Sequence, residues 1–175
     1  PFREHDNPIP STIYGVSKLY AEKLGEYYVA KTKMNVVSLR LARLFGYGER
    51  PGVVFMKYMN LSREKKPLTV WGEGKTSIEY LYVKDAVCAI DKAIQSDFPS
   101  GVYNVGPGKA YSVLEIAEAI NSVCGNSGNI IFDHDKPEGN YNILMDSTKF
   151  NLLTGWTAKW GLLDAIEDIN ILSKE

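Results

Sequence analysis

The sequence predicts an α/β fold, because runs of strand-forming residues alternate with segments whose apolar residues recur at helical spacing. Residues 36–44, VVSLRLARL, form a mostly apolar run that begins with two β-branched valines. Such a run is typical of a strand that is buried on both faces of a parallel sheet. The chain has 175 residues, of which 45% are hydrophobic, so one globular domain is the simplest expectation and two would be small.

Capping residues and apolar periodicity locate the expected helices. Ser11 or Thr12 can cap the first helix, and Ser112 followed by Glu115 has the spacing of a capping box at the start of a later one. The predicted helices cover residues 13–33, 53–63, 84–95, 113–123, 147–154 and 162–171.

Short apolar runs bounded by glycine, proline and polar residues locate the expected strands. The predicted strands cover residues 36–44, 68–71, 79–83, 102–105 and 129–132. A long loop containing Gly46, Gly48, Pro51 and Gly52 follows the first strand. Its GxG piece and the one at residues 106–108 lack the third glycine and the following helix of a phosphate-binding turn, so both are predicted to be ordinary turns.

The composition argues against several classes of function. The formal net charge is −1, so no basic excess favours nucleic acid or an anionic membrane, and no apolar run is long enough to span a bilayer. Cys88 and Cys124 lack the spacing of a ligand pair and are expected to be small core residues of a reduced, cytoplasmic protein. His5 and His134 lie far apart in the sequence, so no metal site is expected.

The segment Tyr14-Gly15-Val16-Ser17-Lys18 places a phenol and an ammonium one helical turn apart, on the same face of the first predicted helix. A free phenol has a pKa of about 10, and a neighbouring ammonium lowers the pKa of a phenol. The pair is therefore a candidate for proton exchange near neutral pH. Tyr27 with Lys31 and Tyr80 with Lys84 share the YxxxK spacing, so the spacing alone is weak, and we expect those two pairs to be packed tyrosines beside solvated lysines.

Five ordered motifs together resemble the extended short-chain dehydrogenase/reductases, the nicotinamide-dependent epimerases and dehydratases of nucleotide sugars that include UDP-glucose 4-epimerase. The resemblance covers nearly the whole chain. Its motifs are Glu4…Pro8-Ile9-Pro10…Tyr14-Gly15-Val16-Ser17-Lys18…Glu22, Leu39-Arg40-Leu41-Ala42…Gly46, Gly72-Glu73-Gly74…Tyr82-Val83-Lys84-Asp85-Ala86-Val87, Tyr103-Asn104-Val105-Gly106, and Asp146-Ser147-Thr148-Lys149…Gly155-Trp156.

The resemblance implies the C-terminal part of a Rossmann-type parallel sheet plus a smaller α/β substrate-binding lobe. Residues 1–66 would be the remnant of the Rossmann domain that carries the YxxxK helix. Residues 67–175 would be mainly the substrate-binding lobe, with some segments returning to the sheet. The family's dinucleotide fingerprint and catalytic Ser/Thr precede the tyrosine, so we expect this chain to be a fragment that is inactive alone and a full-length protein that is a homodimer.

The resemblance also implies roles for particular residues. Tyr14 would be the general acid/base for a sugar hydroxyl, and Lys18 would hold the nicotinamide ribose and activate the phenol. Leu41 and Ala42, at the end of the central strand, would lie against the nicotinamide end of the cofactor. The cofactor would be NAD or NADP, with NAD favoured, and the substrate a nucleotide sugar.

Several positions that would contact the substrate depart from the family pattern. Arg43 stands where the family has an asparagine that contacts the diphosphate, and Ile78 stands where it has a phosphate-binding arginine. Val53 stands where the next helix often starts with a polar residue, and its neighbour Val54 is a candidate substrate contact. Arg43 either supplies the cation that is missing at Ile78 or is a solvated side chain at the end of the strand.

The expected nucleobase pocket would be lined by Thr69 and Trp71. Trp71 either stacks on a base or is a core tryptophan.

Three hypotheses for function follow from these residues. The first is a nucleotide-sugar epimerase, or a dehydratase or reductase of the same family. The second is a relative that uses the same hydride chemistry on a non-nucleotide substrate, which Arg43 and Ile78 favour. The third is a non-catalytic relative, against which the intact Tyr14 and Lys18 pair argues. The stretch Lys136-Pro137-Glu138-Gly139…Leu144-Met145-Asp146 resembles GDP-fucose synthases but is too short to choose the substrate.

Overall fold

A computed structural model describes residues 1–50, 52–95, 97–139 and 141–173, and within these ranges it confirms the predicted α/β class. The helices are α1 Ile13–Lys31, α2 Val54–Arg63, α3 Val83–Ala93, α4 Val113–Val123, α5 Thr148–Thr154 and α6 Leu162–Leu172. The strands are β1 Val37–Leu41, β2 Arg43–Phe45, β3 Leu68–Trp71, β4 Ser77–Tyr82, β5 Gly101–Val105, β6 Ala110–Ser112, β7 Ile130–Asp133 and β8 Asn142–Ile143.

Most strand pairs are parallel. β1 pairs with β5, β2 with β4, β3 with β7, and β8 with β4, all in parallel, whereas β6 is antiparallel to β4. The strand predicted at residues 36–44 is in fact two strands, because the chain changes partner at Ala42. The Ala42 N–H donates to the Val105 oxygen at 2.9 Å and so extends the pairing with β5, and the next residue, Arg43, already pairs with Tyr80 of β4.

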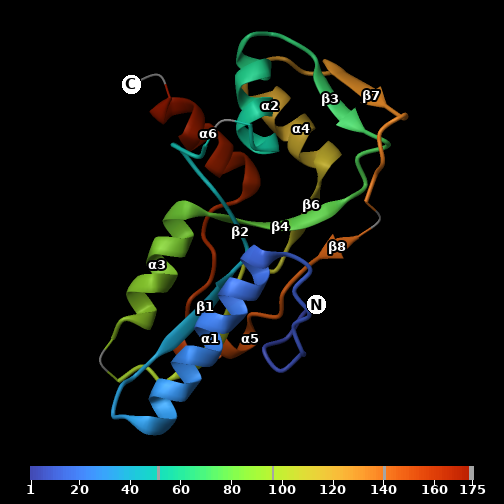
Figure 1. The fold of residues 1–175 in the computed structure, drawn as a ribbon. Coiled ribbons are helices and arrows are strands. Elements are labelled where there is room, and N and C mark those ends of the chain that lie inside the picture. Colours follow the sequence, from blue (N-terminus) through green and yellow to red (C-terminus); the bar gives the residue numbers. More distant parts are fainter. Residues whose placement is uncertain (51, 96, 140, 174–175) are drawn as a thin grey trace.

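The buried apolar residues form two cores, which lie at opposite ends of the molecule in Figure 1. The first core joins α2, α4 and α6 to β3 and includes Met59, Val70 and Ile120. The second core joins α3 and α5 to β1 and β5. Strand β4 serves both, because successive side chains of a strand point to opposite faces: Tyr82 packs in the first core and Leu81 in the second. The predicted division of the chain near residue 66 stays a prediction.

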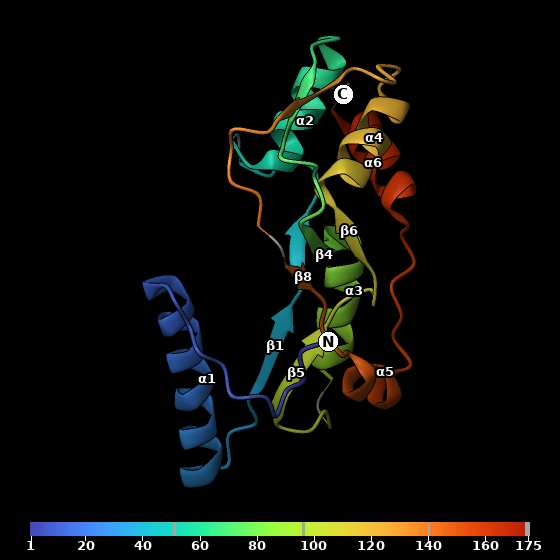
Figure 2. The same ribbon diagram turned by 90° about the vertical axis from the view of Figure 1, so that its right-hand side faces the viewer.

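Helix α1 lies apart from the rest of the molecule on the β1 side, as Figure 2 shows. The Thr12 hydroxyl accepts the Gly15 N–H at 3.1 Å and caps the helix, as the sequence indicated. Its large apolar side chains are mostly exposed, among them Val16, Tyr20 and Tyr27. This helix carries the YxxxK motif, so the residues expected to do chemistry stand at the edge of the molecule.

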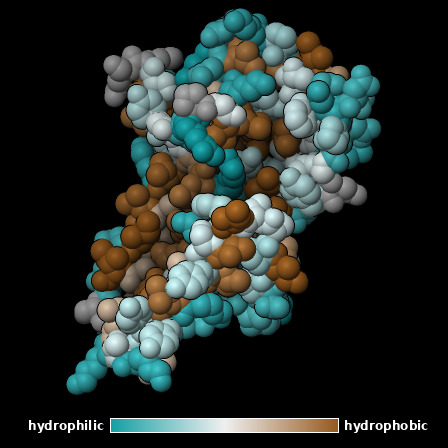
Figure 3. Space-filling model, in the orientation of Figure 1, coloured by the Kyte–Doolittle hydropathy of each residue, from teal (hydrophilic) through white to brown (hydrophobic). Residues whose placement is uncertain are grey.

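The prediction that both cysteines are core residues was wrong for Cys88, which is exposed on α3, while Cys124 is half-buried. The same helix exposes the apolar residues Val83, Val87 and Ile90, and its C-cap Ile94 is exposed as well. In Figure 3, which has the orientation of Figure 1, apolar surface is seen on the left, the side on which α3 lies. The side of α3 that faces the interior carries the small residues Ala86, Ala89 and Ala93, all of them buried. No helix within the described ranges combines the length and hydropathy needed to cross a membrane.

The segment between α5 and α6 is fastened to α3 by the buried carboxylate of Asp85. Asp85 accepts the backbone N–H groups of Lys159 at 3.0 Å and Trp160 at 3.1 Å. The indole N–H of Trp156 donates to the Asp85 carbonyl at 3.3 Å. A carboxylate that accepts two N–H groups out of contact with water contributes more than a neutral hydrogen bond. This contact therefore holds the two cores together along the C-terminal segment.

We predict that Asp85→Ala lowers the free energy of unfolding by about 2–4 kcal/mol, because two buried N–H groups lose their acceptor. Urea denaturation of the variant and the parent measures the difference. Asp91→Ala on the exposed side of the same helix is the matched control and should cost under about 0.5 kcal/mol. Equal losses of unfolding free energy in the two variants would show that Asp85 does not stabilise the contact between α3 and the segment before α6.

Candidate active site

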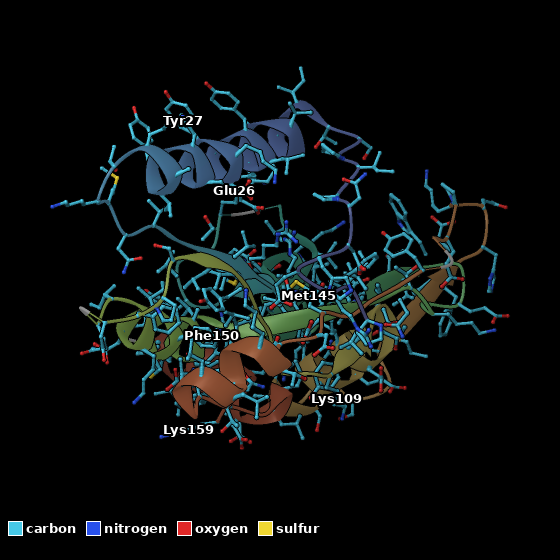
Figure 4. The ribbon with its side chains drawn as sticks, turned by 90° about the horizontal axis from the view of Figure 1, so that it is seen from below. Glu26, Tyr27, Lys109, Met145, Phe150 and Lys159 are labelled. Atoms are coloured by element: carbon cyan, nitrogen blue, oxygen red, sulfur yellow. The ribbon has the colours of Figure 1, made fainter. Side chains whose placement is uncertain are left out.

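Tyr14 and Lys18 lie together on α1, as the helical spacing required. The Lys18 Nζ is 5.2 Å from the centroid of the Tyr14 ring, and the Ser17 hydroxyl donates to the Tyr14 carbonyl at 2.8 Å. Both side chains line a cleft of about 740 Å³ between α1 and residues 38–44, which we call the α1 cleft. Tyr27 of the second YxxxK match lies on the outer side of α1 in Figure 4, away from this cleft.

The α1 cleft contains the other predicted cofactor contacts. Leu41 is half-buried and Ala42 is buried, and both line the cleft at the carboxyl end of β1. The carboxyl ends of parallel strands are where open α/β sheets bind their ligands. The structure thus brings Tyr14, Lys18, Leu41 and Ala42 to one cleft.

A second cleft, of about 400 Å³, contains the predicted substrate contacts, and we call it the Trp71 cleft. Val54, Thr69 and Trp71 all line it, from α2 and β3. Trp71 is 53% exposed, so it is not the core tryptophan that the sequence left open. Ile78 lines the same cleft and offers it an apolar side chain in place of a cation.

Arg43 and Val53 line both clefts, so the two clefts are neighbours at these residues. The Arg43 Nη2 is 3.4 Å from the Oε1 of Glu49, and the Arg43 side chain is 43% exposed. Glu49 itself lines the α1 cleft, so the pair lies in the cleft and not on an outer surface. Arg43 therefore shares the cleft of Tyr14 and already faces one carboxylate there.

Glu49 was not foreseen from the sequence, because it stands in the glycine-rich loop after β2 and matches no motif. Its Oε2 is buried and has no hydrogen-bond partner among the described residues. Burial raises the pKa of the Glu49 carboxyl above its ordinary value, and the nearby Arg43 and Arg50 only partly oppose this shift. A carboxyl in a cleft whose pKa is raised by burial is a candidate functional residue.

Glu138 is a second unforeseen residue. It stands in the loop that lines the Trp71 cleft, and it accepts the N–H of Glu73 at 3.0 Å and also that of Lys75. These bonds, above all the one from the Glu73 N–H, lower the pKa of the Glu138 carboxyl. The carboxylate thereby ties one wall of the Trp71 cleft to the turn between β3 and β4.

Residues 1–106 match the sequence profile of one protein family, described as the NAD dependent epimerase/dehydratase family, and this match covers more than half of the chain. The chain belongs to this family. The prediction that it comes from a family of enzymes is thereby confirmed, and so is the resemblance that its motifs carry.

Curated relatives within the epimerase/dehydratase family match almost the whole chain. The low-salt glycan biosynthesis protein Agl12 of Haloferax volcanii is 29% identical over 167 residues, which are 95% of this chain and 54% of that protein. The uncharacterized UDP-glucose epimerase YtcB of Bacillus subtilis is 28% identical over 165 residues, 93% of this chain and 52% of that protein. The chain thus spans about half the length of these relatives.

Solved structures share the fold over nearly every residue. The UDP-N-acetylglucosamine 4-epimerase of Bacillus cereus superposes with a TM-score of 0.92 and 29% identity over 99% of this chain and 58% of that one. The UDP-glucuronic acid 4-epimerase of Bacillus cereus, in complex with UDP-glucuronic acid and NAD, superposes with a TM-score of 0.82 and 26% identity. The superposition covers 96% of this chain and 55% of that one. The predicted fold, part of a Rossmann-type α/β protein, is confirmed.

We predict that Glu49→Gln raises the free energy of unfolding by about 0.5 kcal/mol at pH 7, because a costly charge is removed from a partly exposed site. The folded pKa is raised, so between about pH 4.5 and that pKa the folded state binds more protons than the unfolded state. The parent therefore loses stability as pH rises through this window, whereas the glutamine does not titrate.

Urea denaturation of both proteins from pH 4 to pH 8 measures this effect. The difference between variant and parent should be near zero at pH 4 and reach its full value above the folded pKa. A difference that is constant across the range would mean that the Glu49 charge is not the cause.

Proposed function

We propose that the full-length protein is a nucleotide-sugar epimerase, or a dehydratase or reductase of the same family, in which Tyr14 is the acid/base for hydride transfer with NAD. The observation that carries the proposal is the placement of the two clefts: Tyr14 and Lys18 line the α1 cleft together with the carboxyl end of β1, and Arg43 lines both this cleft and the neighbouring Trp71 cleft. Relatives with UDP-sugar substrates in their names support the substrate class.

The residues of the α1 cleft fit a nicotinamide cofactor. Lys18 offers an ammonium that donates to ribose hydroxyls, and Leu41 and Ala42 offer a small apolar surface at the strand end. When bound, the nicotinamide ring supplies the acceptor and donor of hydride. Solved relatives in complex with NAD favour NAD over NADP.

Tyr14 supplies the proton chemistry in this proposal. As a sugar hydroxyl is oxidised to a ketone, its proton would pass to the unprotonated Tyr14 oxygen, while the carbon that bears the hydroxyl would lose its hydride to the bound nicotinamide. Return of hydride to the opposite face of the ketone, with the proton returned by Tyr14, gives the epimer. Lys18, one turn away, stabilises the oxygen when it is unprotonated.

The Trp71 cleft would hold the nucleotide. Trp71 presents an exposed indole on which a base can stack, and Thr69 offers a hydroxyl two residues earlier on the same face of β3. Val54 would contact the sugar at the start of α2. Arg43, between the two clefts, would bind the diphosphate with its guanidinium.

One observation favours the second hypothesis, a relative that acts on a non-nucleotide substrate. The charge of Arg43 already faces Glu49, and the neighbouring Ile78 provides no cation. Calorimetric titration of the full-length protein with UDP separates the two hypotheses: binding supports the nucleotide substrate, and no binding with retained hydride chemistry supports the other.

We also propose a cytoplasmic homodimer that uses the outer face of α1. Tyr20, Leu24 and Tyr28 leave apolar surface exposed on this helix, and burial against a partner removes such surface from water. Light scattering of the full-length protein at micromolar concentration measures the mass, and a monomeric mass would contradict the proposal.

We predict that Tyr14→Phe in the full-length enzyme lowers kcat by about 10²- to 10⁴-fold, because only the oxygen that transfers the proton is removed. NAD affinity, measured by calorimetry, should remain nearly unchanged. Tyr27→Phe is the matched control, since Tyr27 has the same spacing to a lysine but faces away from the cleft, and it should keep full activity. Turnover of Tyr14→Phe within tenfold of the parent would place the acid/base role elsewhere.

We predict that Arg43→Ala raises KM for an anionic substrate by roughly ten- to a hundredfold, which corresponds to about 1.5–3 kcal/mol for a hydrogen bond to a charged group. Steady-state kinetics measures KM, and cofactor affinity should change little. Arg43→Lys keeps the charge without the two-pronged geometry and should fall between the parent and the alanine variant. An unchanged KM in Arg43→Ala would remove the support for a phosphate-bearing substrate.

A further inference from the structure

Helix α1 is held to the rest of the molecule by few contacts, although it carries Tyr14 and Lys18. Within α1, all of which the structure describes, Gly25 alone is buried. A Cβ on Gly25 would approach the Val36 Cγ1 to 2.8 Å, so the helix backbone lies directly against the Val36 side chain, just before β1. Glycine contributes no side chain of its own to interlock with this residue, so the contact does little to fix the rotation of the helix about its axis.

A two-pronged ion pair crosses from β1 to the same face of α1. The Arg40 Nε donates to the Glu22 Oε1 at 2.9 Å, and the Arg40 Nη2 donates to the Glu22 Oε2 at 2.8 Å. The two side chains are only 23% and 15% exposed. Two parallel hydrogen bonds between planar groups restrict direction as well as distance, and partial burial weakens competition from water.

Arg40 is itself fixed on the sheet side. β1 turns Val37, Leu39 and Leu41 toward the second core, so Arg40 projects from the opposite face of the strand, toward α1. The Arg40 Nη1 also reaches the Glu4 carbonyl at 3.4 Å, and the Glu4 carboxylate accepts the Asn104 N–H of β5 at 2.9 Å. The guanidinium, carried by β1, is therefore linked through Glu4 to β5 as well, and it presents its donors to the helix from a fixed position.

Glu22 follows Lys18 by four residues and Tyr14 by eight, so the three side chains lie along one face of α1. Lys18, Glu22 and Arg40 all line the α1 cleft. A rotation of α1 that swings Tyr14 and Lys18 out of the cleft would have to break the Arg40–Glu22 pair. The pair thus couples the direction of the YxxxK side chains to the sheet.

We propose that Arg40 and Glu22 are a positioning pair that sets the rotation of α1 and so holds Tyr14 and Lys18 in their reacting geometry. The proposal rests on the proposed function of Tyr14. Neither residue touches the reacting atoms in this arrangement. Their effect is expected in kcat, because a displacement of about 1 Å at a reacting group costs on the order of a hundredfold in rate.

The test uses Glu22→Gln, Arg40→Gln and the double variant in the full-length enzyme, at a temperature where circular dichroism shows each to be folded. We expect kcat at saturating substrate to fall by roughly ten- to a hundredfold in each single variant. KM and NAD affinity should stay within about threefold, because the residues that bind are untouched. The double variant should be no slower than the slower single variant, since the two residues act as one unit.

Two further variants keep the result decisive. Arg40→Lys keeps the charge but cannot make both bonds, so it should lie between the parent and Arg40→Gln even where Arg40→Gln folds poorly. Lys23→Gln removes the exposed Lys23–Glu26 pair, 2.8 Å long and confined to α1, and should leave kcat unchanged. This control separates the loss of any ion pair on the helix from the loss of the one that reaches the sheet.

The proposal is overturned if the folded Glu22→Gln and Arg40→Lys variants keep the parent kcat, or if their effects multiply in the double variant. Tyr14→Phe, measured alongside, separates this failure from failure of the proposed function. An inactive Tyr14→Phe with normal Glu22→Gln refutes the positioning pair alone. An active Tyr14→Phe refutes the role of Tyr14, and the positioning pair with it.

Discussion

The change of strand partner at Ala42 is the constraint on which the candidate site depends. Up to this residue the chain pairs with β5, and from Arg43 it pairs with β4. A chain that leaves one parallel neighbour for another opens the sheet at that point, and side chains at the ends of the strands are left facing a crevice. The α1 cleft lies at this opening, and Arg43 is the first residue beyond it, which is why its side chain borders both clefts.

A second buried carboxylate, that of Glu79 on β4, fastens two loops to the sheet. Glu79 is 1% exposed and accepts the N–H groups of Gly108 at 2.6 Å and Met145 at 2.9 Å. Burial raises the pKa of the Glu79 carboxyl, and these two N–H groups oppose the shift. A Cβ on Gly106 would come within 2.4 Å of the Glu79 Oε1, so this position requires glycine for space. That packing explains the second GxG piece as a turn built around a carboxylate and not around a phosphate.

Periodicity and capping residues located all six helices in the described residues, because each one has a helical pattern or a cap that acts locally. The short strands β6 and β8 were missed, since runs of three and two residues carry no period and form only by pairing with β4. The break at Ala42 was missed for the same reason: the choice between two partners depends on residues far away in the sequence. In the candidate site, Tyr14 and Lys18 could be predicted from their local spacing. Glu49 and Glu138 could not, because three-dimensional contacts define them and no motif contains them.

The parallel pairs have a consequence for how the chain reaches its fold. Val37 pairs with Gly101, and Leu68 pairs with Ile130, so each pair of strands closes a loop of about sixty residues. Contacts of such long range form slowly, because the entropy of loop closure is lost before the hydrogen bonds and the core compensate. During synthesis, β1 and β3 leave the ribosome well before β5 and β7. β1 and β3 must therefore wait for these partners, and assembly of both cores depends on segments that are made later.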